Sequence, residues 1–258
     1  MSDSTTPFPS FAWRYPRVVA HRGGGTLAPE NTVAGIRAGA SRGLKMVEFD
    51  AKLSRDDVVF LLHDDNVDRT SDGRGPAARM DYASIARLDA GRWFDAAFAG
   101  ERMPTLDEAA DACRQAGLAA NIEIKPCPGR ETLTGERVAR QAARLWRDHA
   151  SVPLLSSFSY DALRAARDAE PALPRGLLFG DLPRDWREQV ASLDCVSLHV
   201  AHRVLDEALV GEIKAAGLRI LTYTVNDRER ARELAGWGVD AICTDRIDAI
   251  ADDLLADA

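Results

Sequence analysis

Short apolar runs alternate with amphipathic stretches along most of the chain. The apolar runs predict eight strands, at Arg17–Ala20, Lys45–Asp50, Ala119–Lys125, Pro153–Ser156, Gly176–Phe179, Asp194–His199, Leu218–Val225 and Asp240–Thr244. The stretches between them predict helices, which include Glu30–Arg42, Gly135–His149, Asp161–Glu170, Leu205–Ala216 and Asp227–Gly236. Mostly unbroken apolar strands that alternate with helices indicate a parallel sheet covered on both faces. Eight such units in 258 residues predict a TIM (β/α)8 barrel rather than an open sheet.

Several residues with strong positional preferences mark the helix boundaries. Pro29 suits the first turn of a helix, and Asp161 and Asp227 suit N-caps. Glycines follow three of the predicted helices, at Gly43, Gly117 and Gly217.

One segment interrupts the alternation. Residues 51–104 separate the second strand from a helix predicted at Thr105–Ala116, where a connection normally takes a few residues. The segment contains an extra strand at Val58–Leu62, a turn-rich stretch at 70–75 and an amphipathic stretch at Tyr82–Leu88. We therefore expect a single catalytic domain at 17–258 after an N-terminal extension at 1–16. A small insertion at about 64–104 would lie over the barrel mouth, as a lid or a dimer contact.

The composition narrows the class of protein. Hydrophobic residues make up 46% and charged residues 28%, as in ordinary globular proteins. The net charge of −7, with scattered Lys and Arg, argues against a nucleic-acid partner. No apolar run is long enough to span a membrane, and the first sixteen residues lack the features of a secretion signal. We therefore expect a cytoplasmic protein. We also expect no disulfides, because its four cysteines are far apart. The oligomeric state stays open.

Polar side chains occur at the C-terminal ends of the early strands. In a barrel these ends meet at one mouth, where the chemistry of barrel enzymes takes place. Glu48 and Asp50 are two residues apart on one strand, so both point to the same face, and Glu123 is placed similarly. Three converging carboxylates indicate a hard divalent cation, Mg²⁺ or Ca²⁺. Alternatively, these acids are ion-paired with Arg22 and Lys125.

Two histidines at strand ends favour acid–base chemistry. His21 is followed by Arg22, and His63 precedes two aspartates; imidazoles transfer protons near neutral pH. Arg22 and Lys125 suit a phosphate group. His199 fits either ligand contact or support of other site residues. The glycines at 23–25 suit either an anion cradle or a tight turn.

Six sequence blocks resemble the glycerophosphodiester phosphodiesterase family, most closely its cytosolic bacterial members associated with glycerol-3-phosphate uptake. They are AHRGGGTLAPENT, VEFDAKLSRDDVVFLLHDDNVDRTSDGRG, NIEIKP, LLSSF, LRILTYTVN and GVDAICTDRID, and they extend over almost the entire chain. The resemblance implies a TIM barrel with an insertion after strand two.

The resemblance also implies roles for individual residues. These are an acid–base pair, three divalent-metal ligands, two phosphate-binding residues and two residues that line the pocket for the glycerol or alcohol: His21 and His63; Glu48, Asp50 and Glu123; Arg22 and Lys125; Phe158 and Tyr223. Many family members have Trp where this chain has Tyr223, and a proline is common at Ile247.

The implied reaction is metal-dependent hydrolysis of glycerophosphodiesters, such as glycerophosphocholine and glycerophosphoethanolamine. The products are sn-glycerol 3-phosphate and an alcohol. Two alternatives are a phospholipase of related fold that acts on intact lipids, and a catalytically silent barrel that binds phosphodiesters. The sequence leaves open the metal, the preferred head group, the nucleophile, and which histidine is the acid.

Overall fold

Eight parallel strands close into a barrel in the computed structural model, which describes residue 8 and residues 11–255. The strands are β1 (Val18–Ala20), β2 (Met46–Leu53), β4 (Ala119–Ile124), β5 (Leu154–Ser157), β6 (Arg175–Phe179), β7 (Ser197–Ala201), β8 (Arg219–Tyr223) and β9 (Ala241–Thr244). They follow one another around the barrel, and the pairing of β1 with β2 closes it. The predicted TIM barrel is confirmed.

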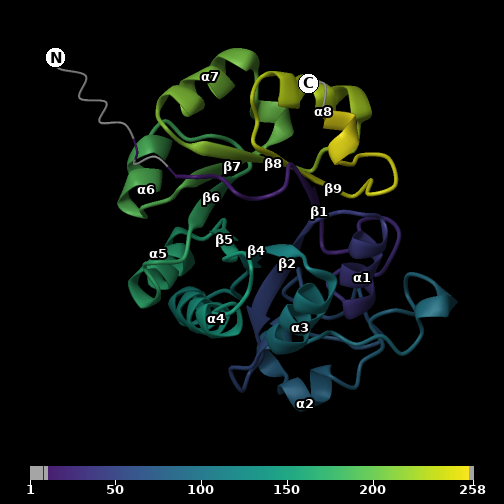
Figure 1. Ribbon diagram of the computed structural model, residues 1–258. Helices are drawn as coiled ribbons and strands as arrows, with labels where there is room; N and C mark the ends of the chain where they lie inside the picture. Colours follow the sequence, from purple (N-terminus) through teal and green to yellow (C-terminus); the bar gives the residue numbers. More distant parts are fainter. Residues whose placement is uncertain (1–7, 9–10, 256–258) are drawn as a thin grey trace.

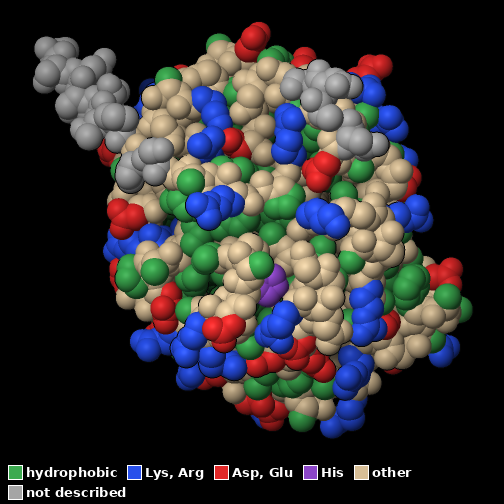
Figure 2. Space-filling model, in the orientation of Figure 1, with side chains coloured by type: hydrophobic (Ala, Val, Ile, Leu, Met, Phe, Trp, Pro, Cys, Tyr) green, Lys and Arg blue, Asp and Glu red, His purple; other side chains and the backbone are tan. Residues whose placement is uncertain are grey.

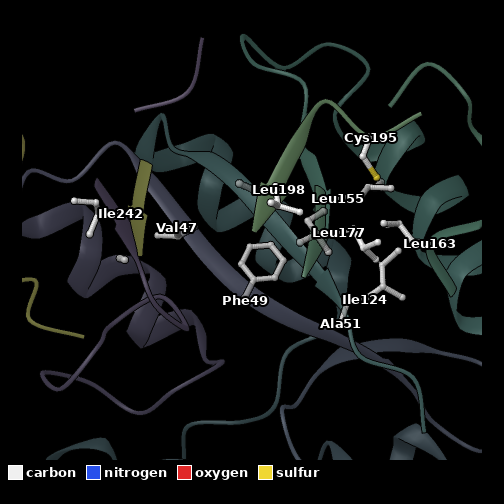
Figure 3. Close-up of a cluster of buried hydrophobic side chains, with 14 of the residues drawn as sticks. Val47, Phe49, Ala51, Ile124, Leu155, Leu163, Leu177, Cys195, Leu198 and Ile242 are labelled. Atoms are coloured by element: carbon white, nitrogen blue, oxygen red, sulfur yellow. The ribbon is translucent and has the colours of Figure 1, made fainter. Parts of the chain in front are cut away.

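Helices surround the strands on the outside of the barrel (Figure 1). They are α1 (Val33–Ser41), α3 (Leu106–Ala116), α4 (Glu131–Leu145), α5 (Tyr160–Ala169), α6 (Trp186–Ser192), α7 (Glu207–Ala215) and α8 (Arg228–Gly236). Figure 3 shows the apolar layer between sheet and helices, where Val47, Phe49 and Ala51 of β2 lie among side chains of neighbouring elements. Burying one such large apolar side chain contributes roughly 1.5–3 kcal/mol to stability.

The segment after β2 forms the predicted small insertion. Strand β3 (Val59–Leu61) pairs antiparallel with the end of β2 and is followed by α2 (Tyr82–Ile85). Figure 1 shows this blue-to-teal segment extending away from the barrel. Its buried residues form an apolar cluster of their own: Phe60, Leu62, Val67, Ala77, Ile85, Ala90 and Met103. The limits of 64–104 stay a prediction. Residues 1–7 and 9–10 of the expected N-terminal extension, and 256–258 of the expected domain, lie outside the described residues.

Several expectations about element boundaries are wrong. Helix α4, for instance, extends over Glu131–Leu145 instead of the predicted Gly135–His149. Strand β2 continues past Asp50 to Leu53, because β3 pairs with its last three residues. Helix α1 begins after Thr32, whose side chain accepts a hydrogen bond from Gly35, so Pro29 lies before the helix. Ser159, rather than Asp161, caps α5. The Asp227 cap and the glycines after α1, α3 and α7 agree with expectation.

The interior of the barrel changes from apolar to polar along its axis. Inward side chains at the N-terminal ends of the strands form a buried cluster: Val19, Met46, Ala119, Leu154, Leu221, Ala241 and Cys243. Trp13 and Tyr15 pack against this cluster from outside. The inward positions that follow along β2 are Glu48 and Asp50. The apolar cluster therefore fills one end of the barrel, and polar side chains occupy the other.

The surface carries a mixture of charges. Basic and acidic side chains are interspersed over the face drawn in Figure 2. Within the described part of the chain, no helix combines the length and the apolar character that crossing a membrane requires.

Candidate active site

The turn after β1 places His21 and Arg22 at the C-terminal mouth of the barrel. The backbone N–H groups of Gly23 and Gly25 donate to carbonyls of residues 20 and 21 within the turn. A Cβ atom at Gly25 would lie 2.1 Å from the backbone oxygen of Asp245, and Gly25 has a φ of +53°. These glycines thus serve the tight turn and its close contact with the loop after β9.

His21 is held by a carboxylate from that loop. Its Nδ1 lies 2.6 Å from Oδ1 of Asp245, and Oδ2 of Asp245 accepts a hydrogen bond of 2.9 Å from Asn226. Burial alone would lower the pKa of His21, but the hydrogen bond with Asp245 and the charge of Glu48 raise it above its usual value.

Glu48, Asp50 and Glu123 converge inside the mouth. The parallel register pairs Asp50 of β2 with Glu123 of β4, so both side chains reach the same height in the barrel. One carboxylate oxygen from each of the three residues lies within 4.8 Å of the other two. Glu48, Asp50 and Glu123 are 4%, 1% and 9% exposed, so all three are shielded from bulk water.

The electrostatics of this cluster fit a bound cation. Burial and the charge of Asp50 raise the pKa of Glu48 to about 8 and that of Glu123 to about 7. Burial also opposes ionisation of Asp50, but Arg22 and Lys125 lower its pKa. Oε1 of Glu48 is buried and has no hydrogen-bond partner among the described residues. A buried oxygen without a partner is costly, and a hard divalent cation would satisfy it.

Two basic side chains flank the carboxylates. Nζ of Lys125 lies 2.8 Å from Oε1 of Glu123 and 3.9 Å from Oδ1 of Asp50. Nε of Arg22 lies 3.7 Å from Oδ2 of Asp50 and has no hydrogen-bond partner among the described residues. The alternative that these acids are ion-paired with Arg22 and Lys125 therefore holds for Asp50 and Glu123 only. The side chain of Glu48 pairs with neither base. Its Oε2 accepts the backbone N–H of Arg22 instead, at 2.9 Å.

His63 reaches the site from the loop just after β3, next to the expected start of the insertion. Its Nδ1 lies 2.7 Å from Oδ1 of Asp64. Burial lowers its pKa, the charge of Asp50 raises it, and Arg22 lowers it again, with a net result below the usual value. His63, Glu123 and Lys125 line a groove of ≈ 530 Å³ that gives a ligand access from solvent.

Two aromatic residues lie beside this groove. Phe158 is 48% exposed, and its ring meets the ring of Tyr223 edge-on with centroids 5.8 Å apart. Nζ of Lys125 lies 5.3 Å from the Phe158 ring centroid. The hydroxyl of Tyr223 donates to the backbone oxygen of Phe179, at 2.8 Å, so its proton is already used within the protein.

His199 lies deeper, inside the barrel. It is fully buried and lines a cavity of ≈ 30 Å³ together with His21 and Glu48. Its Nε2 lies 3.0 Å from the hydroxyl of Ser197, and burial lowers its pKa to about 3. His199 is therefore neutral and is separated from solvent.

Sequence reasoning assigned no role to four polar residues of the site: Glu30, Asn31, Asn226 and Asp245. Asn31 has a φ of 56° and exchanges two hydrogen bonds with Asp50, one from its side-chain amide at 2.8 Å and one to its carboxamide oxygen at 2.9 Å. The missed residues lie in loops after β1, β8 and β9. Polar residues that follow apolar runs were the available signal.

Comparison with known proteins decides the family. The model of the glycerophosphoryl diester phosphodiesterase family matches residues 21–249. The chain belongs to this family. A glycerophosphodiester phosphodiesterase of Caldanaerobacter subterraneus subsp. tengcongensis is 33% identical over 88% of this chain and 93% of its own length. Membership makes the chain a glycerophosphodiester phosphodiesterase by enzyme class.

Solved structures of similar proteins have the same fold. An Oleispira antarctica phosphodiesterase, in complex with the product sn-glycerol-3-phosphate, is 35% identical with a TM-score of 0.85 and covers 95% of this chain and 98% of its own. A glycerophosphodiester phosphodiesterase from Agrobacterium tumefaciens is 28% identical with a TM-score of 0.77, over 94% and 100% of the two chains. The family fold thus extends over nearly all of this protein.

Proposed function

We propose that this phosphodiesterase hydrolyses small glycerophosphodiesters, such as glycerophosphocholine and glycerophosphoethanolamine, to sn-glycerol 3-phosphate and an alcohol. The observation that carries the proposal is the buried triad of carboxylates, Glu48, Asp50 and Glu123, beside Arg22 and Lys125. The similar Oleispira enzyme holds sn-glycerol 3-phosphate, and this supports the same product here.

The three carboxylates would hold a divalent cation, Mg²⁺ or Ca²⁺. When bound, such a cation neutralises charge on a non-bridging phosphate oxygen and lowers the pKa of an attacking hydroxyl. Nε of Arg22 is buried and has no partner within the described part of the chain, so it can donate to a second phosphate oxygen. The ammonium of Lys125 adds a second positive charge at the same place. Together these groups would bind the anionic diester and orient it.

His21 and His63 would transfer the protons. One imidazole removes a proton from the nucleophile as its oxygen bonds to phosphorus, and the other protonates the alcohol oxygen as its bond to phosphorus breaks. Nδ1 of His21 lies against Asp245, and Nδ1 of His63 lies against Asp64. In both rings Nε2 therefore faces away from the carboxylate. The nucleophile is water, or the 2-hydroxyl of the glycerol through a cyclic phosphate.

The aromatic pair would pack against carbon atoms of the substrate. Phe158 exposes about half of its surface beside the groove, and Tyr223 supports its ring edge-on. A methylene or methyl group of the glycerol or alcohol moiety would cover this apolar surface.

Product analysis tests the proposal. ³¹P NMR of glycerophosphocholine incubated with the protein and Mg²⁺ or Ca²⁺ should show glycerol 3-phosphate, and ¹H NMR of the same sample should show an equal amount of free choline. Excess EDTA should abolish the release. Phosphocholine as the product, or no release with any divalent ion, would contradict the proposal.

The same assay separates the two alternatives. Hydrolysis of phosphatidylcholine vesicles at a rate similar to that of glycerophosphocholine would favour a phospholipase. Saturable binding of glycerophosphocholine without turnover would favour a silent phosphodiester-binding barrel.

A further inference from the structure

The guanidinium of Arg69, in the insertion, lies between two carboxylates from different parts of the fold. Its Nη1 and Nη2 donate to Oε2 and Oε1 of Glu30, at 2.7 and 2.8 Å. Its Nε and Nη2 donate to Oδ2 and Oδ1 of Asp64, at 2.7 and 3.0 Å. The arginine therefore makes two forked contacts at once, which a lysine ammonium has no geometry to reproduce.

Each of these carboxylates also holds a residue of the proposed site. Oε1 of Glu30 accepts a hydrogen bond of 2.8 Å from Nη1 of Arg22. Oδ1 of Asp64 lies 2.7 Å from Nδ1 of His63. An unbroken series of contacts thus runs from Arg22 through Glu30, Arg69 and Asp64 to His63, and it joins the loop before α1 to the insertion.

Charge and partial burial favour this series of contacts. The side chain of Glu30 is 14% exposed and that of Asp64 is 32% exposed. Burial would raise the pKa of Glu30, but Arg69 and Arg22 lower it. The hydrogen bond from Arg69 holds the pKa of Asp64 well below its usual range. Both carboxylates are therefore ionised, and their two charges balance those of the two arginines.

We propose that Arg69 is a positioning residue, which holds Arg22 and His63 in register through Glu30 and Asp64. This inference rests on the proposed function, because it assigns Arg22 to the phosphate and His63 to proton transfer. Without Arg69, Asp64 would lose both of its guanidinium contacts and could turn away from the imidazole. Glu30 would keep Arg22 as its partner but lose its connection to the insertion. The segment after β3 then completes the proposed active site, because it supplies both His63 and the arginine that fixes it.

Substitution of Arg69 tests the proposal against a matched control. Arg55 also lies after β2 and makes a forked contact to one carboxylate, Asp81, through Nε at 2.7 Å and through Nη2. Among the described residues, this pair has no hydrogen bond or ion pair with a residue of the proposed site. We expect Arg69→Met to lower kcat/KM for glycerophosphocholine by at least ~10-fold, since small misplacements of reacting groups are costly. For Arg55→Met, kcat/KM should stay within about twofold of wild type, and Tm should change about as much as in Arg69→Met.

The separate arms of the network predict a split between kcat and KM. Asp64→Asn should act mainly on kcat, because it disturbs His63, and Glu30→Gln mainly on KM, because it disturbs Arg22. Arg69→Met should change both constants. The double variant Arg69→Met/Asp64→Asn should lose less than the product of the single losses, because both changes break the same connection. Arg69→Lys keeps the charge and should remain at least ~5-fold below wild type.

Three results would overturn the inference: kcat/KM of Arg69→Met within twofold of wild type, full recovery in Arg69→Lys, or equal losses of activity and Tm in Arg69→Met and Arg55→Met. If Arg69→Met does not fold, Arg69→Lys is held to the same ~5-fold criterion. The wild-type reaction separates the two levels. Wild-type protein that releases no glycerol 3-phosphate would overturn the proposed function and this inference with it, whereas active wild type with an equally active Arg69→Met would overturn the inference alone.

Discussion

Single residues in this site are defined by what each carboxylate touches. Asp50 is buried between Asn31, Arg22 and Lys125, which favour its charged form. Glu48, in contrast, has one oxygen for which residues 11–255 supply no hydrogen-bond partner. Two carboxylates separated by one residue on the same strand thus have opposite pKa shifts. Such divergence is common at functional sites, where it prepares groups for different tasks. Here the divergence is consistent with an ionised Asp50 and with a Glu48 whose ionised form a bound cation would stabilise.

His199 should make the stability of the protein depend on pH. Its pKa is about 3 in the fold, against 6.5 when exposed, so between these values the unfolded chain binds more protons. Stability should therefore fall as the pH falls below about 6.5. From pH 7 to pH 5 the contribution of His199 amounts to about 2 kcal/mol.

Urea unfolding at several pH values measures this effect. His199→Gln should reduce the pH dependence between pH 7 and 5 by about that amount. The control His202→Gln should reduce it less, because this histidine is only partly buried, although its pKa is lowered too. Equal pH dependence in wild type and His199→Gln would contradict the buried, neutral state of this histidine.

At the scale of elements, the turn between β1 and α1 packs against the loop after β9. Gly25→Ala would bring a Cβ atom onto the backbone of Asp245, the residue that holds His21. We expect a loss of about 3 kcal/mol in stability together with reduced kcat, because both turn and carboxylate must move. Thermal unfolding and steady-state kinetics measure the two effects.

Gly43→Ala is the matched control for this prediction. Gly43 has a φ of +85°, so alanine is strained there too, but no atom lies within 4 Å of the added Cβ. It should cost about 1 kcal/mol and leave kcat unchanged. Equal effects of the two substitutions would show that backbone strain, rather than the contact with Asp245, determines the loss.

The features that could be predicted follow from local sequence patterns, whereas those that could not be predicted depend on contacts between distant segments. The period of two along β2 was sufficient to place Glu48 and Asp50 on one face, and alternation of strands and helices was sufficient for the barrel. The extension of β2 to Leu53 depends on pairing with β3, a contact between segments. Asp245 acts through a contact with His21 that only the closed barrel creates, because β1 and β9 lie at opposite ends of the chain. Glu30 acts through Arg69 of the distant insertion as well as through its neighbour Arg22. Local patterns carry no record of such contacts.

At the scale of the whole molecule, the two ends of the barrel have separate tasks. Trp13 and Tyr15 pack edge-on, with ring centroids 4.9 Å apart, against the apolar cluster at the N-terminal ends of the strands. The carboxylates and histidines lie at the opposite, C-terminal end. Stability and chemistry should therefore respond to different substitutions, as is typical of TIM barrels.

Trp13→Ala tests this separation. Because Trp13 is only partly buried, the expected loss in stability is about 2 kcal/mol, below the ~3–5 kcal/mol of a fully buried tryptophan. The kcat/KM for glycerophosphocholine should stay within twofold of wild type. Trp93→Ala, at a residue 40% exposed in the insertion, is the control and should lose less stability. A large fall in kcat/KM for Trp13→Ala at a temperature where it remains folded would contradict the separation.

The central claim is that a divalent cation and the His21/His63 pair together hydrolyse glycerophosphodiesters. The most direct measurement is the rate of glycerol 3-phosphate release from glycerophosphocholine by wild type, His21→Asn and His63→Asn, before and after EDTA and after return of Mg²⁺ or Ca²⁺. We predict release by wild type only with the cation, and a loss of at least ~10²-fold in kcat for each variant with Tm preserved. Near-wild-type turnover in either histidine variant, or full activity in EDTA, would contradict the account.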